Sequence, residues 1–320
     1  MKHSRWKQWG VAAAKWLVVV VVIGFIHHTI ADAWQQLSHH PPRLQLGWLV
    51  LSGAMYLIGT LLCGVFWYYS LRVLGQPVRF GQALRAYYIG HLGKYVPGKA
   101  MVVILRAGLI RGRGVDTSLA AAAVFFETLT MMATGAMLAG AIVAIWFRGE
   151  PQLFWASVGL MLVAGLPTSP PVFRRLTRLV GVGRKKPEIV AKLDSLGWLA
   201  MLVGWFLTGI GWIFQGFGFW AVLRALGCAD PNPWMQLPLC AAAVTLATVA
   251  GFLSFVPGGA VVREAVLAEL MIPHLGGGVS LISAVLLRMV GLVAELAISG
   301  ILYLGVRGPK SSAENRRNEG

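Results

Sequence analysis

The sequence predicts an all-α polytopic membrane protein made of two inverted repeats, each with a re-entrant helical hairpin broken at a Val-Pro-Gly element. Three observations lead to this fold class. Of the 320 residues, 57% are hydrophobic and only 12% are charged, about half the charged fraction of a soluble domain. Apolar stretches of about 20 residues, the length that crosses a bilayer, recur along the chain. Two apolar regions are interrupted by the same element, VPGKAMVV at 96–103 and VPGGAVVR at 256–263.

Apolar stretches long enough to cross the membrane are predicted at six places. The first follows a basic start, and no small-residue cleavage site comes after it, so we interpret it as an uncleaved helix rather than a signal peptide. The six predicted spans are 11–30, 47–71, 115–147, 153–171, 198–224 and 279–306.

The regions 80–111 and 235–272 are predicted to be hairpins, because proline ends a helix and glycine allows the sharp turn that follows. Each limb of the first hairpin has about 14 residues, or ~21 Å of helix, which is too short to span the bilayer comfortably. We therefore expect both regions to be re-entrant. The limb at 235–255 is longer and could cross.

The distribution of Lys and Arg predicts both termini in the cytoplasm. If each hairpin returns to its own side, nearly all basic residues fall on the cytoplasmic side of the membrane. The exceptions are Arg43, Arg148, Arg224 and Arg263 outside and Arg288 within the last span. We expect a multi-pass protein of the cytoplasmic (inner) membrane.

An ordered series of matched blocks predicts an internal duplication. LRVLG at 71–75 matches LRALG at 223–227, and ALRAYYIGHLGKYVPG, which starts at 83, aligns without gaps to AVTLATVAGFLSFVPG, which starts at 243. AAVFFE and SAVLLR then match, ending at Glu127 and Arg288. Three crossings separate the two units, so their orientations in the membrane should be opposite, as in many secondary transporters. The chain would be a single integral membrane domain over 1–320, with repeat 1 at about 47–147, repeat 2 at about 198–306 and a disordered tail at 310–320.

Two other function classes are excluded by the pattern of residues. Gly93, Gly98 and Lys99 have the spacing of a nucleotide-binding P-loop, but Ala100 stands where that loop needs Ser or Thr and no strand precedes it. The net charge of +16 does not indicate a nucleic-acid partner, because the basic residues flank apolar spans. The histidines between 27 and 40 match no defined metal site. We expect no metal, no cofactor and no nucleic acid.

Charges inside predicted spans are the strongest functional signal. Glu127 and Arg288 occupy equivalent positions in the two repeats, near the bilayer midplane, where a lone charge costs about 2.5–3.5 kcal/mol. We expect an ion pair across the repeat interface or two walls of one polar cavity; the alternative is a buried pair that only fixes helix register. Glu295 lies seven residues after Arg288, on about the same helix face.

The two Val-Pro-Gly turns are candidate sites for an anionic head group. A helix that begins at such a turn has unpaired N–H groups and the positive end of its dipole there. Lys94 and Lys99 would add positive charge, although they also fit an ordinary cytoplasmic placement. Glu264 follows the second turn directly, beside Arg263. The candidate lipid-path residues are Lys94, Pro97, Gly98, Lys99, Arg106, Glu127, Pro257, Gly258, Gly259, Glu264 and Arg288.

The block HLGKYVPGKAMVVILRAGLI, followed by GVDTSLAAAAVFFETL, resembles the first signature of the lysylphosphatidylglycerol synthase transmembrane-region family, also called the flippase-like domain. VPGGAVVREAVLAELM, followed by SAVLLRMVGLVAEL, is similar to its second signature, P-G-G-x-G-x-x-E and then an Arg-bearing helix. The resemblance covers about 47 to 306. One departure is Val261, which stands where the second signature usually has Gly.

The resemblance implies movement of a lipid or lipid-linked precursor between leaflets. The best-known members of the family carry a soluble aminoacyl-transferase domain as well, and we expect none here, because only a short polar tail follows residue 306.

We therefore predict a non-enzymatic flippase-like protein whose partners are membrane lipids, either anionic phospholipids or polyprenyl-linked lipids. An intramembrane lipid-modifying enzyme is an alternative, but the sequence has no D-x-D, H-E-x-x-H or G-x-S-x-G motif and no catalytic residue is assigned. Another alternative is a non-catalytic membrane subunit of a lipid or cell-envelope glycan biosynthesis system, working with a partner enzyme.

Overall fold

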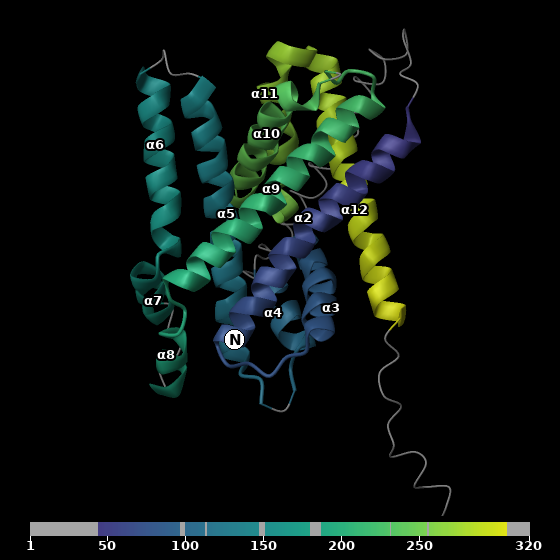
Figure 1. Ribbon diagram of the computed structural model, residues 1–320. Helices are drawn as coiled ribbons and strands as arrows, with labels where there is room; N and C mark the ends of the chain where they lie inside the picture. The colour runs from purple at the N-terminus through teal and green to yellow at the C-terminus, as the bar shows by residue number, and fades with distance from the viewer. Residues whose placement is uncertain are drawn as a thin grey trace, which may run out of the picture.

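The computed structural model describes residues 44–96, 100–112, 114–146, 151–179, 187–230, 232–254 and 256–305, which form helices joined by short turns (Figure 1). No β-strand occurs in these ranges. The predicted span at 11–30, the histidine-rich segment and the tail at 310–320 lie outside the described residues. The helices are α2 (Leu46–Val73), α3 (Phe80–His91), α4 (Ala100–Leu109), α5 (Thr117–Trp146), α6 (Pro151–Gly165), α7 (Pro170–Leu179), α8 (Pro187–Leu193), α9 (Trp198–Ala225), α10 (Pro233–Leu253), α11 (Val262–Leu275) and α12 (Gly277–Gly305), with 3₁₀ turns η1 (Leu92–Tyr95), η2 (Leu166–Thr168) and η3 (Pro257–Gly259).

Five of the described helices are long and apolar enough to cross a membrane, so the chain is an all-α, multi-pass membrane protein, as the sequence predicted. α2, α5, α9 and α12 correspond to four of the six predicted spans. The fifth is α10, the longer limb of the second hairpin.

The predicted span at 153–171 is shorter than expected. α6 has 15 residues, about 22 Å of helix. It ends at η2, which contains Pro167, and Pro170 begins α7. Proline lacks the N–H that would continue the helix and disfavours helical angles in the residue before it, so two prolines this close together divide the apolar stretch.

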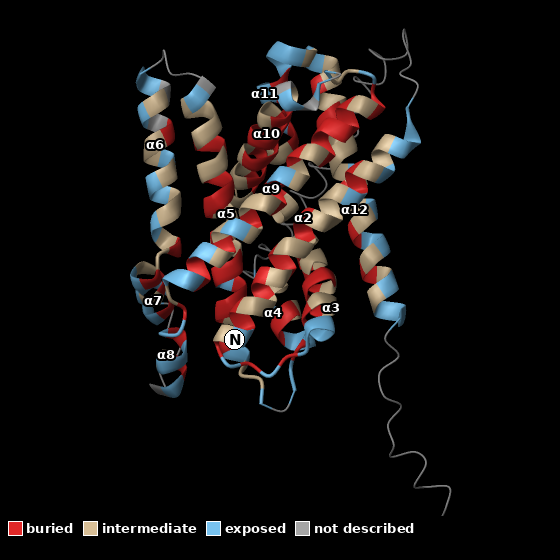
Figure 2. Ribbon diagram, viewed as in Figure 1, coloured by how far each residue is buried: buried red, intermediate tan, exposed pale blue. Residues whose placement is uncertain are grey.

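Apolar side chains cover much of the outer surface, as expected for a protein surrounded by lipid. Trp155 and Leu162 on α6 and Val293 and Ile301 on α12 are all exposed. In Figure 2 the buried residues gather on the inner sides of α5, α9 and α10, while α6 and the outer end of α12 are largely exposed. Such a surface is stable in hydrocarbon and would be a large apolar patch in water.

α2 and α9 form a tight antiparallel pair that runs diagonally through the molecule (Figure 1). The Gln45 N–H, just before α2, donates to the carbonyl of Ala225 at the end of α9, at 3.2 Å. Midway, a Cβ on Gly59 would lie 2.6 Å from the Gly211 carbonyl oxygen, and one on Gly211 would lie 2.9 Å from that of Gly59. Small residues let two backbones approach closely in the membrane, and here glycine is the residue that fits.

The two L-R-x-L-G blocks end α2 and α9 with the same backbone geometry. Gly75 (φ 67°) and Gly227 (φ 73°) adopt the left-handed conformation. Each glycine N–H donates to the carbonyl of the arginine three residues earlier at 3.0 Å, and the next N–H donates at 2.9 Å to the leucine five residues before it. These hydrogen bonds satisfy carbonyls that a helix end leaves free.

The two hairpins lie at opposite ends of the bundle and their turns meet inside it. α3 and α4 lie at the lower end of Figure 1, and α10 and α11 lie in the upper half. The turns η1 and η3 contact each other, and a Cβ on Gly258 would lie 3.3 Å from Cδ1 of Tyr95. α3 and α4 have 12 and 10 residues, too few to span the bilayer.

The second turn contains a strained backbone position at Val261, which has φ 68° and ψ −50° and is the only non-glycine with positive φ among the described residues. This region of backbone space costs a β-branched residue about 1–3 kcal/mol. Val261→Gly should therefore leave the melting temperature unchanged or raise it, because the strain relieved matches or exceeds the entropy cost of glycine, about 0.5–1 kcal/mol.

The matched control is Val262→Gly, which places glycine at a helical position in the first turn of α11 and should lower the melting temperature. Thermal unfolding in detergent, followed by circular dichroism, compares the two variants. A lower melting temperature for Val261→Gly than for Val262→Gly would show that Val261 is not strained.

Candidate functional site

A cavity of about 310 Å³ lies between the two hairpins. Its walls are formed by α2, α3, α4, α5, α9 and α10, by the turns η1 and η3, and by Arg263 of α11. Most of its lining is apolar, with Val102, Val103 and Met132 among the residues, and tyrosine and charged side chains make up part of the rest. Two apolar lining residues, Val96 and Phe125, are 42% and 49% exposed, so the cavity reaches the outer surface of the bundle.

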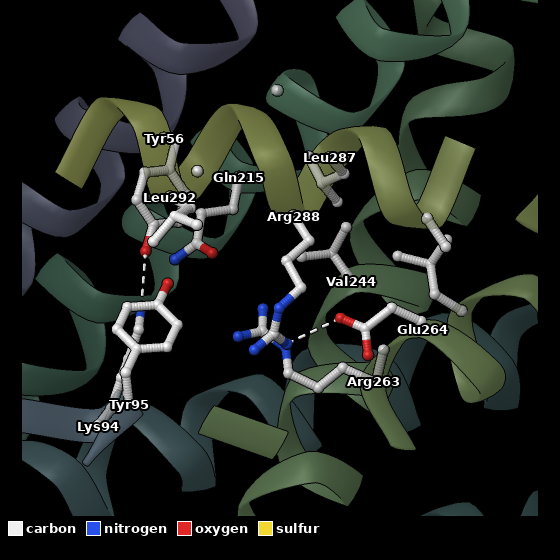
Figure 3. A pocket seen from close by; sticks show the side chains of 15 residues that line it. Tyr56, Lys94, Tyr95, Gln215, Val244, Arg263, Glu264, Leu287, Arg288 and Leu292 are labelled. Atoms are coloured by element: carbon white, nitrogen blue, oxygen red, sulfur yellow. Dashed lines mark hydrogen bonds and ion pairs between the residues drawn. The ribbon is translucent and has the colours of Figure 1, made fainter. Parts of the chain in front are cut away.

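A second, smaller cavity of about 50 Å³ adjoins the first. Tyr56, Lys94, Gln215 and Arg263 line both cavities. Figure 3 shows the smaller cavity, with Arg288 reaching into it from α12. The two cavities therefore share a polar part of their lining.

Arg106 and Glu127 form a buried ion pair between α4 and α5. Arg106 Nη1 donates to Glu127 Oε2 at 2.8 Å, and both side chains are 2% exposed. The Tyr87 hydroxyl donates to Glu127 Oε1 at 2.9 Å, and the guanidinium lies 3.8 Å from the centre of the Tyr87 ring. The space for Arg106 exists because residue 90 is glycine: a Cβ there would lie 3.1 Å from the Arg106 backbone nitrogen.

Arg288 and Glu264 form the corresponding pair between α12 and α11. Arg288 Nη1 donates to Glu264 Oε1 at 2.7 Å and to the carbonyl oxygen of Gly258 at 3.2 Å. Gly258 turns its carbonyl toward the guanidinium from a left-handed backbone conformation, φ 61°. The Arg288 side chain therefore connects α12 to the second Val-Pro-Gly turn.

Glu295 connects the last helix to the first hairpin. Its carboxylate pairs with the ammonium group of Lys94 and accepts a hydrogen bond from the Tyr56 hydroxyl. The Tyr95 hydroxyl donates to Glu295 Oε2 at 3.0 Å, and His91 Nε2 lies 3.5 Å from Oε1. Four side chains of the first half of the protein (α2 to α5) thus surround one buried carboxylate of the second half (α9 to α12).

The prediction of an ion pair between Glu127 and Arg288 is wrong, because each residue pairs with a charge on the hairpin of its own half. The ion pair that does connect the two halves is Lys94–Glu295. Glu127 lines the larger cavity and Arg288 the smaller one. A sequence repeat indicates which positions are equivalent, but the partner of each charge depends on helix packing.

Those of the other predicted lipid-path residues that the structure describes also lie around the two cavities. The larger one is lined by Lys94, Arg106, Pro257, Gly258 and Gly259, and the smaller one by Lys94 and Glu264. Pro97, Gly98 and Lys99 lie outside the described residues.

Several residues of the site were not among the predicted lipid-path residues. Glu295 and Arg263 carried a signal, since one follows Arg288 by seven residues and the other adjoins Glu264. Tyr56, Tyr87 and His91 carried none, because tyrosine and histidine in apolar helices are common for reasons of packing.

The comparison with known families agrees with the sequence signatures. The family model of the lysylphosphatidylglycerol synthase TM region matches residues 9–299. No curated protein matches the sequence.

Proposed function

Because the chain belongs to the family of lysylphosphatidylglycerol synthase transmembrane regions, we propose that it moves an anionic phospholipid or a polyprenyl-linked lipid between the two leaflets. The observation that carries this proposal is the charge-lined cavity between the hairpins, which reaches the lipid-facing surface at Val96 and Phe125. A head group needs polar partners at membrane depth, and acyl or prenyl chains need a lateral opening into lipid. The cavity supplies both.

We also propose that the two halves are inverted repeats. The α2–α9 crossing supports this, because Gly59 and Gly211 are separated by the same offset that aligns Leu71 with Leu223. An antiparallel pair that crosses at equivalent residues is self-complementary about a two-fold axis through the crossing.

Hydrogen bonds away from the crossing support the same symmetry. The offset that aligns Gly59 with Gly211 makes Thr208 the counterpart of Tyr56, and the offset that aligns Glu127 with Arg288 makes Thr134 the counterpart of Glu295. Tyr56 donates to Glu295, and the hydroxyls of Thr134 and Thr208 are hydrogen-bonded at 2.8 Å. The same contact therefore occurs twice, charged in one place and neutral in the other.

This symmetry supports an alternating-access mechanism. Within each half, an ion pair holds a hairpin to the following long helix: Arg106–Glu127 in the first and Glu264–Arg288 in the second. Between the halves, the polar contacts to Glu295 lie at the cavity, where a head group could replace them. Each half would move as a unit around the substrate, opening the cavity first to one leaflet and then to the other.

In this proposal the protein is not an enzyme, lies in the cytoplasmic membrane with both termini inside, and takes membrane lipids as its partners. An envelope-biosynthesis enzyme that consumes the transported lipid would be its protein partner.

Transport can be measured in proteoliposomes with fluorescent lipids whose exposure is read by a membrane-impermeant quencher. We expect the protein to speed transbilayer movement of labelled phosphatidylglycerol or of a labelled polyprenyl phosphate. Val103→Trp should bring the rate down to that of protein-free vesicles, because it fills the cavity without changing its charge. Arg288→Gln should slow transport by removing a polar wall of the path.

Two variants serve as controls. Val50→Trp adds the same bulk at an exposed position on α2, and Arg72→Gln removes a cation that is exposed and lines neither cavity. Both should transport like the unaltered protein. If folded protein leaves anionic, zwitterionic and polyprenyl-linked probes in their original leaflet, unaided transport is refuted. The subunit alternative then predicts a stoichiometric partner on purification from the native membrane.

A further inference from the structure

The charges around the two cavities do not balance. Among the described residues, three acid–base pairs line or border them: Arg106–Glu127, Lys94–Glu295 and Arg288–Glu264. Arg263 lines both cavities and has no carboxylate partner in the described part of the chain. Its one hydrogen-bond acceptor there is the hydroxyl of Thr248, at 3.0 Å from Nη2.

The backbone holds Arg263 against the second Val-Pro-Gly turn. A Cβ on Gly259 would lie 2.9 Å from Arg263 Cγ, and one on Gly258 would lie 3.1 Å from Arg288 Nη2. Two guanidinium side chains therefore pack on adjacent glycines, with one carboxylate, Glu264, to serve both. Figure 3 shows both reaching into the smaller cavity, one from α11 and the other from α12.

Two further features of the smaller cavity, next to Arg263 and Glu264, suit a ligand that has a negative charge and a hydroxyl group. Arg263 is in the first turn of α11, whose amide groups have no carbonyl one turn earlier to bond, and no side chain caps this end. Glu264 Oε2 is buried and has no hydrogen-bond partner among the described residues. A guanidinium can donate two parallel hydrogen bonds to phosphate oxygens, and a free carboxylate oxygen can accept from a hydroxyl.

We propose that Arg263 binds the phosphodiester of a singly anionic, hydroxylated lipid head group, and that this site disfavours the aminoacyl ester of the same lipid. The proposal rests on the proposed function and specifies its substrate class. One phosphodiester neutralises Arg263, the one unpaired cation among the described residues that line the cavities. An aminoacyl ester such as the lysyl ester has more ammonium groups than phosphates, so it would add positive charge next to Arg263. Lys94 and Arg288 lie nearby, and their carboxylate partners are already in use.

The test is equilibrium binding to the purified full chain in detergent, measured by native mass spectrometry, which does not depend on transport. The probes are dioleoylphosphatidylglycerol, its lysyl ester and dioleoylphosphatidylcholine, with soluble glycerophosphoglycerol as a competitor. We expect phosphatidylglycerol to bind best. Arg263→Gln should weaken its binding by about tenfold or more, since a charge-assisted bidentate contact is lost.

Arg263→Lys should restore part of the affinity, because it keeps the charge and loses the fork of donors. Arg72→Gln removes an exposed charge elsewhere on the protein and should leave binding unchanged. Competition by glycerophosphoglycerol would show that the head group alone is recognised; without competition, the acyl chains contribute to a site that still depends on Arg263.

Three results would overturn the proposal: equal binding of all three lipids, tighter binding of the lysyl ester, or unchanged phosphatidylglycerol binding in a folded Arg263→Gln variant. Failure of transport is separate from these outcomes. If the protein binds phosphatidylglycerol through Arg263 but moves no lipid, only the proposed function is refuted. If the protein transports all the lipids at the same rate and Arg263→Gln leaves these rates unchanged, only this inference is refuted.

Discussion

Glu127→Gln is expected to destabilise the folded protein by about 3–5 kcal/mol, the loss typical of removing one partner from a buried ion pair. Arg106 would remain charged, because arginine does not deprotonate in proteins, and at 2% exposure its side chain recovers little solvation from water. The neutral amide keeps one acceptor oxygen in place of two and cannot offset the charge. The measurement is the free energy of unfolding from a titration with sodium dodecyl sulfate in mixed micelles.

The matched control is Glu269→Gln, which removes an exposed carboxylate on α11 and should change the stability by no more than about 0.5 kcal/mol. The double variant Arg106→Gln/Glu127→Gln should lose less than the sum of the two single losses, because it leaves no unpaired charge. Additive losses would mean that the two side chains do not stabilise each other in the membrane.

Gly59→Ala is expected to destabilise the α2–α9 pair by about 1–3 kcal/mol, because the new methyl group overlaps the backbone of the facing helix. The carbonyl oxygen of Gly211 would lie 2.6 Å from the added Cβ, and backbone atoms cannot rotate away as a side chain can. The helices must separate, which also disturbs the cavity between them. Both the melting temperature in detergent and lipid transport should fall.

Gly209→Ala provides the control on α9 itself. A Cβ at Gly209 meets no atom within 4 Å, so this change should keep or raise the melting temperature through the better helix propensity of alanine. The two substitutions are chemically identical and their predicted effects have opposite signs. If both stabilise, α2 and α9 are not in backbone contact at this crossing.

These expectations separate two kinds of polar contact in the protein. Arg106–Glu127 joins neighbours within one half, and both side chains are only 2% exposed, so its loss should appear as lost stability. Lys94, which pairs with Glu295 of the other half, is 20% exposed on a cavity wall. A contact between the halves that a ligand can reach is where substrate binding could change the relative stability of two conformations.

The sequence by itself determined the fold class and most of the long helices. Length, apolar composition and the absence of breaking residues are local properties, and α2, α5, α9 and α12 depend on little else. The apolar stretch at 153–171 was overestimated, although the two prolines that shorten it, Pro167 and Pro170, are visible in the sequence. The glycine of each L-R-x-L-G block also specified its helix end directly, because only a left-handed residue completes that pattern of hydrogen bonds.

Only the tertiary structure decided which charges meet. Glu127 and Arg288 were recognised as membrane-embedded charges, but their partners proved to be Arg106 and Glu264. Helical periodicity indicates which residues share a face, whereas an ion pair also depends on the rotation and depth of a second helix, which the close contact of Gly59 with Gly211 helps to set. That Arg263 has no carboxylate partner among the described residues emerges only when the neighbouring charges are in place, because electrostatic balance is a property of the assembled cavity and not of any segment of the chain.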